Sequence, residues 1–365
     1  MDLNERKRLL KEYMALPRVS GYEGPAARRL REDLGRWAAA SVIDRVGNVI
    51  ATFPGTDPKA PAVMVFAHMD TIGYIITYID PDGFIKVDRM GGVPEKAVAS
   101  SAVLVGTENG TWVDGIIATK SYHVQTPEEK SKADSLAKMF IDIGAASRQQ
   151  VLDLGIQVGC PVSYRPIAFD LLNDRICGSY LDDASGMVTM VEVAQQLAAV
   201  PHKSTVYLVG TVWEEFNARG AMMAARSVHP DMAVCLLGPG AGDTPDLKGT
   251  TNVVMEGGPA VTLFNFHGKG TLNGCVAHKG MYDLMKRAAA DSGLSLQRSA
   301  GRGALSDTAY LQLEDMGIPC LDMGCPDRYS HSPYECLSLA DHANTGKLLY
   351  RFLTYVDDTF VLDRY

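Results

Sequence analysis

His68 and Asp70 stand directly after an apolar run, residues 62–67, that is typical of a strand buried on both faces. One ring nitrogen of a histidine can bind a metal ion while a nearby carboxylate holds the other N–H group and fixes the tautomer. His68 is therefore a candidate metal ligand, and Asp70 is the candidate residue that orients it. Alone, the spacing is weak evidence, because a histidine near an aspartate is more often an ordinary surface or core pair.

Glu214 and Glu215 follow a second apolar run, residues 205–212. Two adjacent carboxylates repel each other unless a cation or a proton lies nearby. One of them can bind a metal ion while the other, left unbound, acts as general base on a water that the metal activates. A solvated strand end is the alternative, and for this pair alone it is about as well supported. Sites in open α/β sheets form at the carboxyl ends of strands, so both runs point to one crevice.

Asp182 and His331 complete the set of candidate ligands. Asp182 precedes a predicted helix, where the ordinary interpretation is an acidic residue at a helix N-terminus. His331 lies in a polar loop, residues 327–335, where an ordinary surface histidine is the alternative. Taken with the residues above, they supply two histidines, a shared aspartate, a glutamate ligand and a free glutamate. Such a set suits zinc- or cobalt-type ions and can hold two metals bridged by one carboxylate.

The elements that must position these residues alternate between helix and strand at both ends of the chain. The segment 74–172 instead has short β-like runs and turn residues, with one short helix near 147–154. We predict an α/β domain, residues 1–73 plus 173–365, interrupted by a β-rich insertion, residues 74–172. The elements predicted for the α/β domain are helices 2–15 and 23–38, a hairpin over 42–53, strand 62–67, helix 186–200, strand 204–212, helix 217–229, strands 232–237 and 260–266, helices 278–292 and 306–316, strand 318–323 and helix 340–356.

Bulk composition excludes several classes of protein. A length of 365 residues with 46% hydrophobic residues suits two globular domains. The net charge of −8 gives no basic surface for nucleic acid or for an anionic membrane. No apolar run is long enough for a membrane-spanning helix, and the charged start lacks the apolar core of a signal peptide. The seven cysteines form no CxxC pair, which indicates reduced thiols in a cytoplasmic protein.

At its chemistry-bearing segments the sequence resembles the tetrahedral aminopeptidase family, which includes glutamyl and deblocking aminopeptidases. The resemblance covers nearly the whole chain and is highly specific. Its insertion precedes Asp182, whereas carboxypeptidase-like dinuclear enzymes insert their extra domain after the Glu-Glu pair. The matching segments are 67–70 with 72–73, 91–93, 120–123, 126–129, 140–145, 181–183, 214–215, 219–221, 242–245 and 328–333.

The resemblance implies a mixed-sheet α/β/α metallo-exopeptidase domain with an inserted β-barrel-like dimerisation domain. It also implies a role for each ligand: Asp182 would bridge two metal ions and His68 would bind one of them. Glu215 and His331 would bind the other. The peptide bond after Asp182 would be the family's non-proline cis bond.

By the same resemblance, Glu214 would be the general base and Asp70 would orient His68. The expected activity is metal-dependent hydrolysis of N-terminal residues from peptides, with one or two divalent ions per subunit, zinc or cobalt first and manganese as an alternative. The expected assembly is a homo-oligomer, a dimer through the inserted domain and in many members a tetrahedral dodecamer.

Leu237 stands where the family has a further metal-binding aspartate, and a leucine cannot bind metal. Cys235 on the same strand, or Asp243 in the following loop, could replace the missing ligand. Otherwise the second metal binds weakly, the enzyme works with one metal, or the chain is a divergent member with altered or lost activity.

Glycoside hydrolysis is a further alternative for the function. That reaction needs two carboxylates about 5–9.5 Å apart and does not need the set of histidines.

Overall fold

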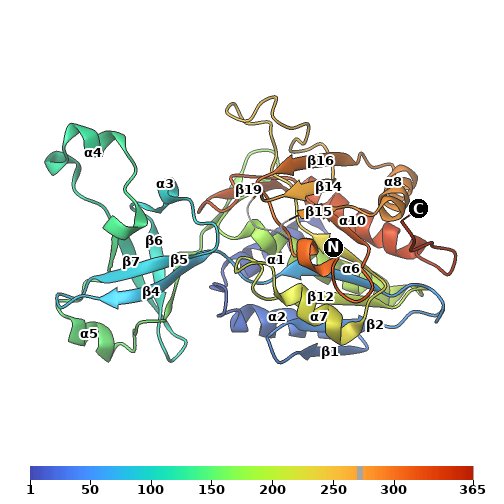
Figure 1. Cartoon of the computed structure of the whole chain (residues 1–365), viewed down its shortest axis with the longest axis horizontal. Helices are drawn as coiled ribbons and strands as arrows, with labels where there is room; N and C mark the ends of the chain where they lie inside the picture. Colours follow the sequence, from blue (N-terminus) through green and yellow to red (C-terminus); the bar gives the residue numbers. More distant parts are fainter. Residues whose placement is uncertain (269–273, 365) are drawn as a thin grey trace.

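The computed structural model describes residues 1–268 and 274–364, which form an α/β body and a smaller barrel beside it (Figure 1). Within these residues, nine strands make one mixed sheet, four make a second small sheet, and six close into a barrel. The predicted fold class, a mixed-sheet α/β domain with an inserted β-barrel, is confirmed. None of the helices in the described residues has the length and hydropathy that a membrane crossing would require.

The centre of the main sheet is formed by parallel strands that are mostly apolar because both of their faces are buried. The order of the sheet is β1-β2-β12-β3-β13-β17-β14-β15, with β16 paired to β14. The four central strands are β12 (Val206–Thr211), β3 (Val63–His68), β13 (Met232–Leu236) and β17 (Cys320–Gly324). The outer strands are β1 (Ala40–Ile43), β2 (Val49–Phe53), β14 (Ala260–Phe266), β15 (Gly274–Val276) and β16 (Gln297–Arg302).

Helices cover both faces of this sheet. One face packs against the helices that share the largest core cluster, and the other face packs mainly against two shorter helices. The first group is α1 (Leu3–Met14), α2 (Gly24–Gly35), α6 (Leu181–Ala199), α8 (Lys279–Asp291) and α10 (Leu339–Tyr355). The second group is α7 (Gly220–Val228) and α9 (Thr308–Leu311). The predicted helices agree with these elements except at one place.

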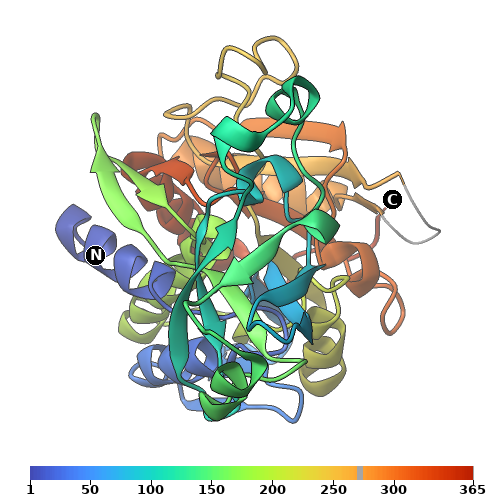
Figure 2. The same cartoon turned by 90° about the vertical axis from the view of Figure 1, so that its left-hand side faces the viewer.

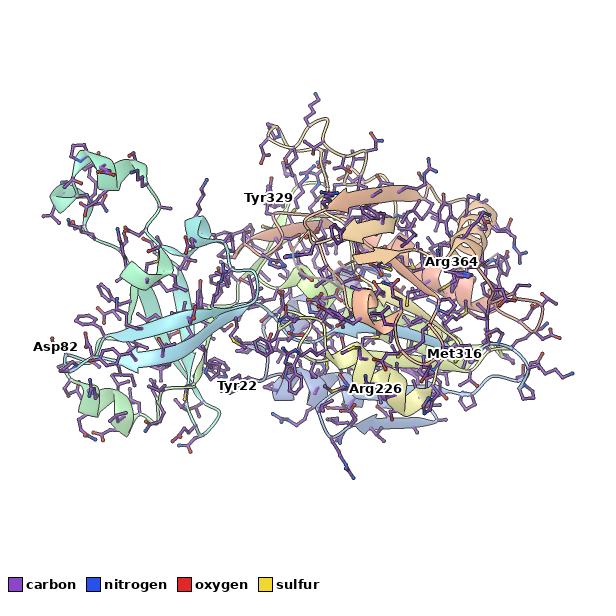
Figure 3. All side chains as sticks on the ribbon, in the orientation of Figure 1. Tyr22, Asp82, Arg226, Met316, Tyr329 and Arg364 are labelled. Carbon is purple, nitrogen blue, oxygen red and sulfur yellow. The ribbon has the colours of Figure 1, made fainter. Side chains whose placement is uncertain are left out.

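The predicted helix 306–316 is wrong in extent, because α9 covers only Thr308–Leu311. Beyond it the backbone continues through tight turns that end at Gly317. Leu313 is 55% exposed and Met316 is fully exposed, at the position labelled in Figure 3. The apolar residues of this segment therefore do not form a buried stripe, so tertiary packing does not extend the helix.

The barrel is built from one contiguous stretch of chain and has its own core. Figure 2 presents it toward the viewer, in front of the α/β body. Its closed order is β4-β5-β8-β7-β6-β9. The strands are β4 (Gly73–Ile79), β5 (Ile85–Met90), β6 (Ala102–Gly106), β7 (Trp112–Ala118), β8 (Phe140–Asp142) and β9 (Pro161–Tyr164). The short helices are α3 (Glu95–Val98), α4 (Pro127–Ser131) and α5 (Arg148–Asp153), the last at the place predicted for a short helix.

After the barrel, the chain enters a small sheet that borders the site. Its order is β10-β11-β19-β18, with β10 (Ala168–Leu171), β11 (Arg175–Gly178), β18 (Asp327–Arg328) and β19 (Glu335–Ser338).

The barrel also contacts the α/β body directly. The hydroxyl of Tyr22, labelled in Figure 3, donates a hydrogen bond to the carbonyl oxygen of Gly159 in the barrel. All seven cysteines lie in described residues as buried, unpaired thiols.

Candidate metal centre

His68 is the last residue of β3, and the main sheet places it beside the end of β12. The parallel register pairs His68 with Thr211, the last residue of β12. Glu214 and Glu215 follow three and four residues later, after a residue with a left-handed backbone, Trp213 at φ 61°. The two apolar runs therefore deliver a histidine and two carboxylates to the same edge of the sheet.

Asp182 reaches this edge from the start of α6. The backbone is not helical there, with φ −82° and ψ 105° at Asp182. The peptide bond between Asp182 and Asp183 is cis, which confirms the expectation drawn from the family resemblance. The side chain of Asp182 is 16% exposed and lies between those of His68 and His331.

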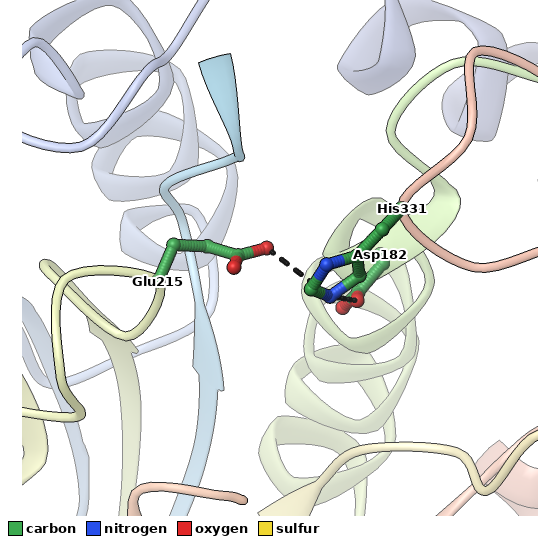
Figure 4. A group of neighbouring side chains, drawn as sticks. All are labelled: Asp182, Glu215 and His331. Carbon is green, nitrogen blue, oxygen red and sulfur yellow. Dashed lines mark ion pairs between the residues drawn. The ribbon is translucent and has the colours of Figure 1, made fainter. Parts of the chain in front are cut away.

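Asp182, Glu215 and His331 form the group that could hold a metal ion among the described residues. One ligand atom from each lies within 4.8 Å of the others. His331 Nε2 is 3.5 Å from Asp182 Oδ2 and 3.7 Å from Glu215 Oε1. Figure 4 draws these ion pairs as dashed lines. Two carboxylates and an imidazole facing one point are a donor set that suits zinc and similar divalent ions.

Both histidines present the same ring nitrogen to Asp182. Nδ1 of His68 lies 3.0 Å from the carbonyl oxygen of Asp70, and Nδ1 of His331 lies 3.0 Å from the carbonyl oxygen of Gly92. A carbonyl oxygen only accepts, so each Nδ1 must carry the proton and each Nε2 is left to bind. His68 Nε2 lies 2.8 Å from Asp182 Oδ1, so the Asp182 carboxylate stands between the two rings.

The carboxylate of Asp70 lies near His68 but forms its hydrogen bonds with other groups. Its Oδ1 is 3.8 Å from His68 Nδ1, and the hydrogen bond of the ring goes to the main-chain oxygen instead. The carboxylate is occupied elsewhere: it accepts from the backbone N–H groups of Glu214 and Glu215, each at 3.0 Å, and from the Ser20 hydroxyl at 2.6 Å. Asp70 therefore orients His68 through its backbone and fixes the Glu-Glu pair through its side chain.

Burial and mutual charge interactions shift the pKa values of all three side chains. Burial raises the pKa of Asp182, but His68 and His331 outweigh it and hold that pKa below its ordinary value. Burial and then the Asp182 charge raise the pKa of Glu215 to about 7, although His331 opposes this. Burial lowers the pKa of His331, but Glu215 and Asp182 raise it to about 11. A divalent cation would stabilise the anionic carboxylates and displace the proton from His331 Nε2.

Glu214 is set apart from the three-residue group. Burial, and then the charges of Glu215, Asp307 and Asp70, raise its pKa well above the ordinary value, while His68 opposes the shift. A carboxylate with a raised pKa is a stronger base, as proton abstraction from water requires. The raised pKa of Glu214 is compatible with the general-base role that the family resemblance implies for it.

Two buried carboxylates near the site were not identified from the sequence. Glu335 accepts from the backbone N–H groups of Asp182, at 2.9 Å, and of His331, at 2.8 Å. Asp307 accepts from the Thr211 hydroxyl at 3.1 Å, and burial raises its pKa to about 7. Glu335 lies within the polar segment 327–335 in which His331 was identified, but nothing in that segment marks it as a partner of Asp182.

Leu237 lies one residue beyond the end of β13, the strand that neighbours β3. The register pairs Cys235 with Phe66, which brings position 237 level with His68. Neither proposed replacement belongs to the three-residue group. Asp243 forms a paired contact with Arg328 at 2.8 and 2.7 Å, and Cys235 is a buried thiol whose pKa burial raises well above the ordinary value.

Comparison with known families gives one extensive match. Residues 47–348 match the family described as M42 glutamyl aminopeptidase. One curated relative, the putative aminopeptidase SgcX of Escherichia coli, is 36% identical over 332 residues, which cover 91% of this chain and 88% of the relative. The similarity therefore spans both the α/β body and the barrel.

Solved structures repeat this result. The aminopeptidase APDkam598 of Desulfurococcus kamchatkensis superposes with a TM-score of 0.92 and 29% identity, over 98% of this chain and 97% of that one. The TET1 peptidase of Pyrococcus horikoshii, described as able to assemble into a tetrahedron or a large octahedral shell, has a TM-score of 0.84 and 23% identity. That superposition covers 97% of this chain and 100% of the other, and it shows a common fold.

Proposed function

Because the chain belongs to the M42 glutamyl aminopeptidase family, we propose that Asp182, Glu215 and His331 hold the divalent metal ion of a metal-dependent aminopeptidase. The observation that carries this assignment is the convergence of three ligand atoms within 4.8 Å, with the Asp182 carboxylate between two histidine rings. The substrates are peptides with a free N-terminus. Zinc or cobalt is the proposed ion, with manganese as the alternative.

The chemistry of the side chains gives the cation, Glu214 and Asp70 different roles in the proposed reaction. A divalent cation held there would polarise the scissile carbonyl and acidify a water molecule. Glu214 takes a proton from the attacking water and returns it to the leaving amine. Asp70, which binds the backbone N–H groups of residues 214 and 215, keeps the base and the adjacent ligand in fixed relative positions.

His68 and Asp182 offer a second position that is one ligand short. Their side chains meet at 2.8 Å, but Leu237 occupies the neighbouring place where an oxygen ligand is needed. Two protein ligands are fewer than the three that catalytic zinc sites ordinarily use. We therefore propose one well-held ion per chain and a second position of low affinity.

The barrel is proposed as the dimerisation domain of a homo-oligomer. In this division, residues 74–172 form the inserted domain and residues 1–73 plus 173–365 form the catalytic domain. A tetrahedral dodecamer is the larger assembly proposed, supported by the shared fold of the Pyrococcus horikoshii peptidase. The proposed location is the cytoplasm, supported by the buried unpaired cysteines.

The function is tested by measuring hydrolysis of a panel of aminoacyl anilides by chain that has been stripped of metal and then given zinc, cobalt or manganese. We expect no activity before metal is added and hydrolysis afterwards. The N-acetylated form of the best substrate is the matched control, since an aminopeptidase needs the free amine. Equal hydrolysis of the blocked substrate, or cleavage of a soluble glucan in place of anilides, would overturn the proposal.

A further inference from the structure

Asp182 and His331 share an unusual need: each has a backbone N–H group outside a regular hydrogen-bond ladder. Asp182 stands in the first turn of α6, where N–H groups have no intrahelical partner. His331 has a left-handed backbone, with φ 66°, in the loop between β18 and β19. An N–H group without a regular partner is stabilised by an acceptor within the protein, and both conformations can gain from one.

The carboxylate of Glu335 accepts a hydrogen bond from both N–H groups. Glu335 Oε2 accepts from Asp182 N at 2.9 Å, and Glu335 Oε1 accepts from His331 N at 2.8 Å. Each oxygen therefore serves one proposed metal ligand, and the two ligands come from segments that are far apart in the sequence. The carboxylate spans the gap between them.

Glu335 is itself held by regular structure. It is the first residue of β19, where it pairs with Gly178 at the end of β11, and it is only 2% exposed. The strand leads directly into Ser338, the N-cap of α10. Because β19 is fixed by its pairing with β11, the Glu335 carboxylate can hold the backbones of Asp182 and His331 in place, although their own segments are irregular.

We propose that Glu335 is a positioning residue that sets the distance between Asp182 and His331 and so determines the affinity of the metal site. This inference rests on the ligand assignment made under Proposed function. The alternative is that Glu335 only stabilises the fold, as many buried carboxylates do.

Asp341 provides the matched control for that alternative. It too is 2% exposed and accepts from two backbone N–H groups of a distant segment, Glu256 at 2.5 Å and Gly258 at 2.9 Å. Neither of those residues is a proposed ligand. Loss of the Asp341 carboxylate removes the same type of bonding without touching the metal group.

The test compares zinc affinity, measured by competition with a chromogenic chelator, in the parent chain, E335Q and D341N. A glutamine has one acceptor oxygen, and its amide would face the other N–H group as a second donor. We expect E335Q to bind zinc about 10- to 100-fold more weakly, and D341N to stay within about twofold of the parent. Thermal unfolding of the metal-free proteins shows whether the two substitutions cost similar stability.

E335D covers the case in which E335Q does not fold. It keeps the charge and both acceptor oxygens but withdraws them by one methylene, so we expect zinc affinity between those of E335Q and the parent. Parent-like zinc affinity in whichever Glu335 variant folds, or an equal loss in D341N, would overturn the positioning role. D182N separates this failure from failure of the ligand assignment, because parent-like zinc binding by D182N would refute the assignment itself.

Discussion

The carbonyl oxygen of Gly92, in the loop after β5 of the barrel, lies 3.0 Å from Nδ1 of His331. This contact fixes the proton on Nδ1 and leaves Nε2 to face Asp182 and Glu215. A Cβ atom on Gly92 would lie 2.8 Å from that same Nδ1. The barrel therefore supplies an acceptor to a member of the three-residue group, and residue 92 must approach the His331 ring without a side chain.

G92A should displace the His331 ring and weaken zinc binding by roughly 10- to 100-fold. Chelator competition on the purified variant measures the change. G301A is the matched control, since both glycines have ordinary φ angles and a Cβ on Gly301 meets nothing within 4 Å. Equal zinc affinity in G92A and G301A would show that the contact is dispensable.

E214Q should lower turnover by about 10²- to 10⁴-fold while zinc remains bound, because the substitution removes the proton acceptor and no ligand. Activity on an aminoacyl anilide and zinc content of the same sample check both halves of this statement. E215Q is the companion variant, and it should lose zinc. An E214Q protein with parental turnover would remove Glu214 from its proposed role.

The two histidines should differ in what their removal does to metal content. H331A takes away a member of the three-residue group and should leave zinc well below one ion per chain. H68A leaves that group complete and should retain about one ion. Elemental analysis after dialysis against low zinc decides between them, and the reverse order would place the well-held ion at His68.

L237D should create the oxygen ligand that the second position lacks, since the register of β13 with β3, continued two residues past Cys235 and Phe66, brings residue 237 level with His68. We expect the zinc content at saturation to rise by about one ion per chain. L237N is the control, as it introduces a polar group of similar size without a charge. If L237D binds no more zinc than L237N, the missing aspartate is not what limits the second position.

His342 gives a pH-dependent prediction away from the metal. Its Nδ1 accepts from Arg6 at 2.9 Å and its Nε2 donates to the Ser185 carbonyl, so the buried ring is neutral. Burial and then the Arg6 charge lower its pKa to about 3, against 6.5 for an unperturbed histidine. As the pH falls from 6.5 toward 3, His342 therefore binds a proton in the unfolded chain but not in the folded chain, and the free energy of unfolding decreases.

Glutamine at this position cannot titrate, so H342Q isolates the effect. The parent should lose stability relative to H342Q by up to about 1.4 kcal/mol for each pH unit within that window. Urea unfolding of the metal-free proteins at several pH values measures the difference. Parallel pH profiles for the two proteins would show that the ring does not resist protonation.

The ligand candidates could be found from sequence because His68 and Glu215 are polar exceptions after apolar runs, His331 lies in a short polar loop, and Asp182 stands at the start of a predicted helix. His68 and Glu215 follow strands, and parallel strands bring such residues to one edge. Glu335 and Gly92 could not be found in this way. Their contacts join segments that are distant in the sequence, and only the completed packing shows that one carboxylate serves two ligand backbones.

For the fold, too, the elements could be predicted from the sequence but the pairing of the barrel strands could not. Apolar runs and helical periodicity located the central strands and most helices, because burial on one or both faces leaves a pattern in the residues themselves. The barrel strands are short and half-exposed, so the sequence indicated β structure without its pairing. The helix expected over 306–316 shows the opposite error, since its apolar residues Leu313 and Met316 face solvent.

The barrel is a single uninterrupted segment, whereas β3 lies between β12 and β13, which both come after the barrel in the chain. During synthesis from the N-terminus, every strand of the barrel is therefore available before β3 has either of its sheet neighbours. A ribosome that has just passed residue 172 carries a complete set of barrel strands and an apolar β3 with no partner on either side. This strand of the α/β body has neither native neighbour until β12 is translated, and during that interval its apolar surface and unpaired edges are prone to aggregation.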